Sequence, residues 1–171
     1  LNKSSKLLNQ VEIDYSKDWI YKHESAIEYN YKDSPFFDLY WNEIKKIFDR
    51  KYEKLFELNI AFINYFSSIL QISTKTVFSS DLDINSTGSK KLLDICKSFS
   101  ADTYISGEMG HDYLDMDIFK DENIDVIFEK FECPKYSQRY LGFKPNMSVI
   151  DLLFNEGEKS KEILHNSNNH I

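Results

Sequence analysis

The residues with the clearest capacity for chemistry lie between Ser106 and Tyr113. Gly107 and Gly110 follow directly on an apolar run, and the chain holds only 5 glycines. Glycine lets a backbone adopt positive φ and approach a ligand closely. We therefore expect Ser106, Gly107 and Gly110 to shape a pocket, with Tyr113 orienting its occupant. A plain turn between a strand and a loop is the alternative interpretation.

A second polar and aromatic stretch spans residues 133–140. Tyr136 offers a ring on which a sugar can stack, and Gln138 offers an amide that reads hydroxyl or carboxylate groups. His23 and Asp151 are the candidates for proton transfer, and hence for catalysis. For His23 the alternative is a hydrogen-bonded core histidine, since it falls on the apolar side of a helical pattern. For Asp151 the alternative is a favourable charge in the first turn of a helix.

Other common site types find little support in the sequence. Cys96 and Cys133 form no Cys-x-x-Cys pair, so neither a zinc site nor a disulfide framework is indicated. Glu108 and His111 have the i, i+3 spacing of helical metal sites, but Gly110 intervenes and no second such motif occurs. We expect no metal. No particular cofactor is indicated, and no Gly-x-Ser-x-Gly motif of a serine hydrolase is present.

Composition and charge narrow the class of protein. The formal net charge is −7, from 21 basic and 28 acidic side chains, and argues against binding nucleic acid or anionic lipid. Aromatic residues make up 15% of the chain, which suits both a core and a binding surface. No apolar run approaches the length of a membrane span, and no signal peptide is evident. A reducing cytoplasm is the simplest location.

The elements that must position these residues follow from hydrophobic periodicity. Spacing of three and four residues predicts helices, and β-branched or alternating runs predict strands. The predicted helices are 18–31, 35–48, 55–70, 90–100 and 149–154, with Ser89 and Ser148 as caps of the last two. The predicted strands are 11–14, 74–80, 103–107 and 125–131. The helix over 55–70 is apolar on a wide face and is expected to pack across a sheet.

Alternation of strands and helices is typical of a parallel sheet covered by helices. In that architecture ligands bind outside the carboxyl ends of the strands, where Ser106 and Gly107 would lie. We find no repeat and no linker, so we expect one α/β domain over residues 1–171. Residues 165–171 are polar and are expected to form a frayed tail.

Several runs of this sequence resemble the WbqC-like protein family of bacteria. The most specific agreement is at the C-terminal end, and weaker agreement extends over nearly the whole chain. The matching runs include Ala101–Gly107, Gly110, Tyr113–Asp115, Tyr136, Gln138, Phe143, Pro145 and Met147–Gly157. The family typically opens with a strand and a Gln-Pro-x-Phe-x-Pro-x-x-Gly-Tyr motif, which is absent here. We therefore expect this chain to be the C-terminal three-quarters of a longer one.

The resemblance implies a function in O-antigen or surface-glycan biosynthesis. It favours a transferase that adds an acyl or aminoacyl group, such as glycine, to a nucleotide-linked or lipid-linked amino sugar. The alternatives are a non-catalytic sugar- or nucleotide-binding module and a scaffold whose aromatic surface is a subunit interface, and a homo-oligomer is compatible with each. The strand that ends on glycine is also similar to the opening of Rossmann-type folds. We thus expect a three-layer, Rossmann-like, mostly parallel sheet with covering helices, and a helical N-terminal part.

Overall fold

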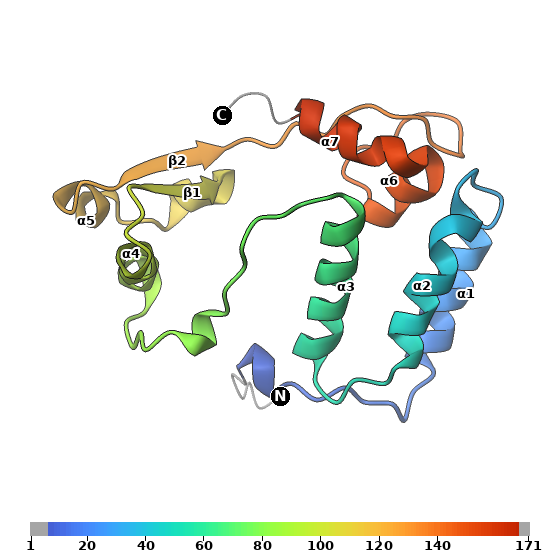
Figure 1. The fold of residues 1–171 in the computed structure, drawn as a ribbon, viewed down its shortest axis with the longest axis horizontal. Coiled ribbons are helices and arrows are strands. Elements are labelled where there is room, and N and C mark those ends of the chain that lie inside the picture. The colour runs from blue at the N-terminus through green and yellow to red at the C-terminus, as the bar shows by residue number, and fades with distance from the viewer. Residues whose placement is uncertain (1–6, 168–171) are drawn as a thin grey trace. The chain divides into compact units, whose positions relative to one another are not determined.

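The computed structural model describes residues 7–167, and the chain divides into two compact units (Figure 1). The first unit comprises the chain up to Ser73 together with Cys133–Ser167. The second comprises the intervening segment, Thr74–Glu132. Helices and a parallel pair of strands confirm a fold that mixes α and β structure. A single domain over residues 1–171 stays a prediction.

The first unit is helical, and four of its helices lie close to the predicted ranges 18–31, 35–48, 55–70 and 149–154, whereas the helix over Ser160–Ser167 was not predicted. In chain order it holds η1 (Leu8–Gln10), α1 (Trp19–Tyr31), α2 (Phe37–Asp49), α3 (Leu55–Ile69), α6 (Val149–Glu156), η4 (Gly157–Lys159) and α7 (Ser160–Ser167). Apolar residues at helical spacing define each long helix, because that spacing gives one continuous face to bury. The tail expected over 165–171 overlaps α7 as far as Ser167, and residues 168–171 lie outside the described part.

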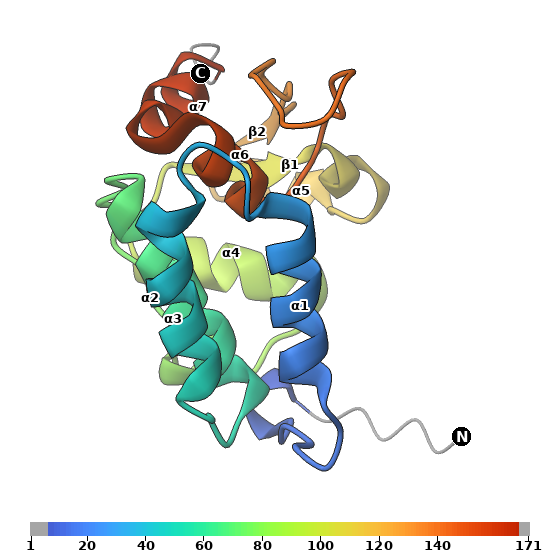
Figure 2. The ribbon, with the colours of Figure 1, turned by 90° about the vertical axis from the view of Figure 1, so that its right-hand side faces the viewer.

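Helices α1, α2 and α3 lie alongside one another in this unit (Figure 2), and aromatic side chains from these helices and from α6 form its core. Phe37 stacks on Trp41 within α2, and it also contacts Phe154 of α6 with ring centroids 5.1 Å apart. The backbone amide of Phe36 donates to the Phe154 carbonyl at 3.0 Å, which ties the start of α2 to α6. The apolar face of α3, expected to cover a sheet, instead joins this helical core against α2. The core thus fixes α6, the helix that carries Asp151.

The second unit is built around two short parallel strands. It holds η2 (Ser79–Asp81), α4 (Gly88–Ser98), β1 (Thr103–Gly107), η3 (Glu108–Asp112), α5 (Met116–Asp121) and β2 (Asp125–Glu129). Strands β1 and β2 run parallel from the pairing of Thr103 with Asp125 to that of Gly107 with Glu129. Both strands were predicted, and their parallel connection through α5 agrees with a strand–helix–strand unit.

Alternation along the strands separates the two faces of this pair. Tyr104 and Val126 pack on one side against Leu93, Cys96 and Phe119 of α4 and α5. Cys96 is buried among these apolar side chains, and its burial raises the pKa of the thiol, as suits a small core residue rather than a nucleophile. The partners in the middle of the register, Ile105 and Ile127, occupy the opposite face.

Three local predictions are wrong. Residues 74–80 form no strand: every side chain there is exposed, and no described strand pairs with the segment. Residues 11–14 form only a single antiparallel bridge, between Glu12 and Lys54. Helix α4 begins at Gly88 with Thr87 at the cap position, so Ser89 is not its cap, and the Ser89 hydroxyl instead accepts from the Asp115 amide at 3.0 Å.

Candidate functional site

The buried carboxylate of Asp151 is the centre of the candidate site in the first unit. Asp151 lies in the first turn of α6, and its backbone amide donates to the Ser148 carbonyl at 2.9 Å. Leu152, Leu153 and Phe154 after it enter the core, which draws this end of the helix inward. As a result Asp151 is only 6% exposed. A carboxylate so buried requires hydrogen-bond donors, because losing its water is otherwise very costly.

Two donors come from the segment that precedes α6. The Tyr136 hydroxyl donates to Asp151 Oδ2 at 2.6 Å, and the Gln138 side-chain amide donates to the same oxygen at 2.9 Å. These contacts bring together three of the residues that the sequence singled out, Tyr136, Gln138 and Asp151. Among the described residues Asp151 forms no ion pair, so the partners of this carboxylate are neutral.

Gln138 also closes the loop in which it lies. Its amide nitrogen donates to the Lys144 carbonyl at 2.9 Å, and its amide oxygen accepts from the Lys144 backbone amide at 2.7 Å. The side chain therefore replaces the pair of backbone bonds that would join two antiparallel strands. Loop shape and the hydrogen bonding of Asp151 depend on the same amide group.

Tyr31, at the end of α1, faces the same carboxylate. Burial, and then the negative charge of Asp151, raise the pKa of the Tyr31 phenol well above its ordinary value. Burial, followed by the hydrogen bond to Asp151, does the same for the pKa of Tyr136. Both phenols therefore stay protonated at neutral pH, and they act as donors rather than as bases. The sequence identified Tyr31 as a helical apolar residue but not as part of a site.

A pocket of about 300 Å³ opens beside this cluster. Aromatic, amide and charged side chains line it, the mixture that suits a small polar ligand. The lining residues are Asn30, Tyr31, Gln138, Arg139, Tyr140, Leu141, Gly142, Lys144, Met147 and Asp151. Arg139 fastens the loop to the end of α1, since it forms an ion pair with Asp33 and donates to the Asn30 carbonyl at 3.0 Å.

His23, the other predicted proton-transfer residue, lies in a different pocket of the same unit. It is eight positions before Tyr31 on α1, which corresponds to about 12 Å along the helix axis. Its Nδ1 is 2.7 Å from the Trp19 carbonyl, and its side chain is exposed rather than in the core. The structure does not bring His23 to the Asp151 pocket, so a joint role in catalysis stays a prediction.

The remaining predicted residues, Ser106, Gly107, Gly110 and Tyr113, belong to the second unit. Ser106 is buried, and a Cβ at Gly110 would lie 2.2 Å from its Oγ, so close internal packing accounts for that glycine. Gly107 is exposed, and nothing lies within 4 Å of a Cβ placed there. Tyr113 is 63% exposed. A pocket at these residues stays a prediction.

Residues 7–167 contain neither a cluster of metal ligands nor a membrane-spanning helix. In that part of the chain no three side chains of His, Cys, Asp or Glu gather in a way that could hold a metal ion. His111 stacks on Phe128 instead, with ring centroids 3.6 Å apart. No helix there combines the length and the apolar character needed to cross a membrane.

Fold and site together define a helix-rich protein with α and β structure and a polar, aromatic pocket around a buried carboxylate. The sequence model of the WbqC-like protein family matches residues 1–163, and the chain belongs to that family. It is similar to the uncharacterized protein Rv1507c of Mycobacterium tuberculosis, with 30% identity over 149 residues. That alignment covers 86% of this chain and 64% of the relative, so the chain spans less than two thirds of that protein. No solved structure matches this chain.

Proposed function

We propose that this protein is a transferase that adds an acyl or aminoacyl group, such as glycine, to an amino sugar in bacterial O-antigen or surface-glycan biosynthesis. The observation that carries the proposal is the buried Asp151 carboxylate, which has neutral donors and no cationic partner among the described residues. A buried anion of this kind favours a cationic ligand, because an ammonium supplies the missing opposite charge.

The rest of the pocket supports a sugar as the body of that ligand. Tyr31 and Tyr140 offer rings against which a pyranose can stack, while Asn30 offers an amide oxygen for its hydroxyls. Lys144 lines the same pocket and carries the positive charge that a phosphate requires, whereas Arg139 is already paired with Asp33. A nucleotide-linked or lipid-linked amino sugar combines an ammonium group, a sugar ring and a phosphate.

Asp151 has a defined part in the proposed reaction. The bound ammonium has no lone pair, so it first gives one proton to the Asp151 carboxylate. The free amine then attacks the carbonyl carbon of an activated acyl donor, a thioester or acyl phosphate, so a C–N bond forms and the bond to the leaving group breaks. The second proton of the nitrogen leaves with the departing thiolate or phosphate. The Tyr136 and Gln138 bonds hold its carboxylate in place, and a fixed orientation favours such a transfer.

The test is to incubate the purified protein with amino-sugar nucleotides and acyl or glycyl donors, and to follow the sugar by mass spectrometry. We expect a mass increase equal to one acyl or glycyl group. Asp151→Asn keeps the size of the side chain, and we expect it to abolish the product. Asp38→Asn is the matched control, since Asp38 is an exposed aspartate of the same unit that does not line the pocket. A wild-type protein that yields no modified sugar with any donor would falsify the transferase.

A non-catalytic sugar- or nucleotide-binding module is the second candidate. It is favoured because Oδ2 of Asp151 already accepts two hydrogen bonds and both neighbouring phenols are donors, an arrangement suited to holding a ligand. Thermal-shift titration with the same amino sugars separates the two functions, since a module binds them without turnover.

The proposal also includes a fold and a location. The parallel pair β1–β2 supports a three-layer Rossmann-like sheet. A cytoplasmic location and a homo-oligomer are its further elements.

A further inference from the structure

The helical unit contains a second pocket, of about 410 Å³, at the opposite end of α1 from Asp151. Four elements contribute to it: the segment before α1, α1 itself, α2 and α3. The lining residues are Glu12, Ile13, Trp19, His23, Phe48, Leu55, Leu58, Asn59 and Phe62. No residue of the Asp151 pocket is among them. The two pockets are therefore separate candidate binding sites.

Aromatic rings form a continuous wall in this second pocket. The Trp19 and Phe48 rings meet edge to face, with centroids 6.3 Å apart. Phe48 and Phe62 meet in the same way at 4.9 Å, and His23 lies edge-on to Trp19 at 5.6 Å. Walls of this composition favour a flat aromatic guest, because its ring can continue the same pattern of contacts.

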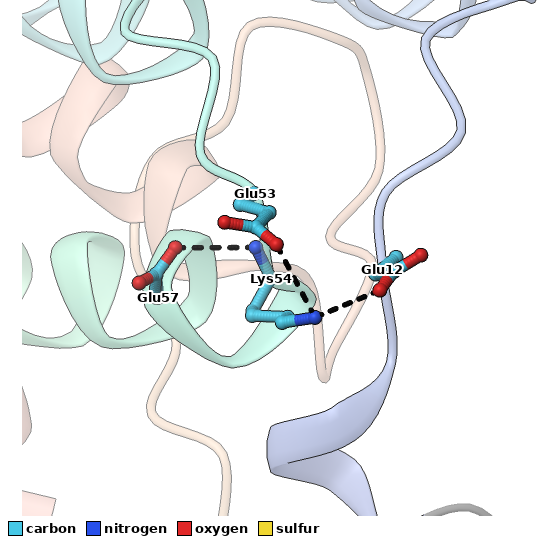
Figure 3. Close-up of polar contacts among 4 residues, drawn as sticks. All are labelled: Glu12, Glu53, Lys54 and Glu57. Atoms are coloured by element: carbon cyan, nitrogen blue, oxygen red, sulfur yellow. Dashed lines mark hydrogen bonds and ion pairs between the residues drawn. The ribbon is translucent and has the colours of Figure 1, made fainter.

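Lys54 joins the segment before α1 to the start of α3 (Figure 3). Its ammonium lies 2.9 Å from Glu12 and 3.5 Å from Glu53, and its backbone amide donates to Glu57 at 3.1 Å. The Ile13 amide also donates to the Glu53 carbonyl at 3.0 Å. The strand-like segment that carries Glu12 and Ile13 is thus held against the start of α3, and the pocket has a defined boundary.

His23 supplies the directional polar group of the pocket. Its Nδ1 is 2.7 Å from the Trp19 carbonyl, and a carbonyl oxygen can only accept a hydrogen bond. The Nδ1 atom must therefore carry a proton, so in the neutral ring Nε2 carries a lone pair. No described residue hydrogen-bonds that atom. A neutral His23 is thereby an acceptor beside an aromatic wall.

We infer that this pocket binds a planar aromatic group that carries an N–H or O–H donor. The ring lies against Trp19, Phe48 and Phe62, and its donor reaches His23 Nε2. The site is independent of the Asp151 pocket, and it gives His23 a binding role in place of proton transfer.

A matched pair of probes tests this assignment. Indole and 1-methylindole have the same ring system, but only indole has an N–H donor. In calorimetric titrations at pH 8 we expect indole to bind about fivefold more tightly, the effect of one hydrogen bond. In His23→Phe, which keeps a ring at the pocket, we expect the two probes to bind equally.

Two further variants keep the result interpretable. Ile13→Trp adds bulk to the pocket wall and should abolish binding of both probes, while Asp151→Asn should leave both affinities unchanged. Circular dichroism confirms that each variant is folded. The assignment is overturned if neither probe binds the wild type, if indole keeps its preference in His23→Phe, or if Asp151→Asn weakens indole binding.

Discussion

The hydroxyl of Tyr136 lies 2.6 Å from the carboxylate of Asp151, and this bond joins a loop to a helix fifteen positions further along the chain. The carboxylate is buried and the tyrosine is half-buried, so the bond is worth more than a similar contact at the surface. It is also charge-assisted, which shortens and strengthens it. The loop over residues 133–148 is consequently held in place by its hydrogen bonds to the buried Asp151. The contribution of the Tyr136 bond to the free energy of unfolding can be measured.

Tyr136→Phe removes this donor without changing the ring. We expect the free energy of unfolding to fall by about 2 kcal/mol, because the buried carboxylate loses a charged hydrogen bond. Urea denaturation followed by circular dichroism measures the change. Tyr29→Phe is the matched control, since Tyr29 is 77% exposed. Equal stability of the two variants would contradict the energetic importance of the Tyr136–Asp151 bond.

Stability should decrease at alkaline pH. Burial, and then nearby Glu43, raise the pKa of Tyr65 from the ordinary value of 10.0 to about 12. A group whose pKa is raised by folding contributes stability that is complete below its unfolded pKa and is lost as the pH rises through its folded pKa. We expect the midpoint of thermal unfolding to fall steeply between pH 10 and 12. Tyr65→Phe should make this fall shallower, and an unchanged slope would refute the assignment.

Gly110→Ala should destabilise the second unit. An added Cβ would lie 2.2 Å from Ser106 Oγ and 2.9 Å from Phe128 Cε1, so side chains must move. We expect a loss of about 1–3 kcal/mol in urea denaturation, as for other overpacked cores. Gly107→Ala is the control, because nothing lies within 4 Å of a Cβ there. Ser106→Ala should restore part of the stability of the Gly110 variant, and absence of any rescue would argue against the Ser106 contact.

Gly157→Ala should destabilise the first unit for two reasons. Its φ of 60° is unfavourable for a residue with a side chain, and a Cβ would lie 2.6 Å from the Phe36 ring. Gly142 shares a positive φ, 83°, but has nothing within 4 Å, so Gly142→Ala reports the backbone effect alone. We expect the Gly157 variant to lower the thermal midpoint more than the Gly142 variant. Similar midpoints would mean that the ring contact is unimportant.

The long helices were predictable from sequence because apolar residues repeat every three or four positions along a helix that buries one face. Trp19, Ile20, Ile27 and Tyr31 repeat at that spacing, and α1 lies where they indicate. Residues 74–80 show the limit for strands: their β-branched and aromatic character suits a strand, but a strand forms only where another strand pairs with it. Helix α5 escaped prediction because six residues are too few to display a period.

The candidate site was predictable only in part. Tyr136, Gln138 and Asp151 have side chains whose chemistry is visible in a sequence, and they do meet. Tyr31 was classed with the apolar face of its helix, because no local pattern tells that its hydroxyl end reaches a carboxylate 120 positions away. Only the packing of α1 against α6 through Phe154 places it there.

The two hydrogen bonds between the Gln138 side chain and the Lys144 backbone have a consequence for how this loop can vary. Because one amide spans the neck of the loop, the five residues between these positions have a length set to fit it. Insertions or deletions among them would pull Gln138 away from Asp151, whereas substitutions at the exposed tip, such as Leu141, would not. The loop is therefore free to change in composition but restricted in length, so diversity among relatives should appear there as residue exchange and not as gaps.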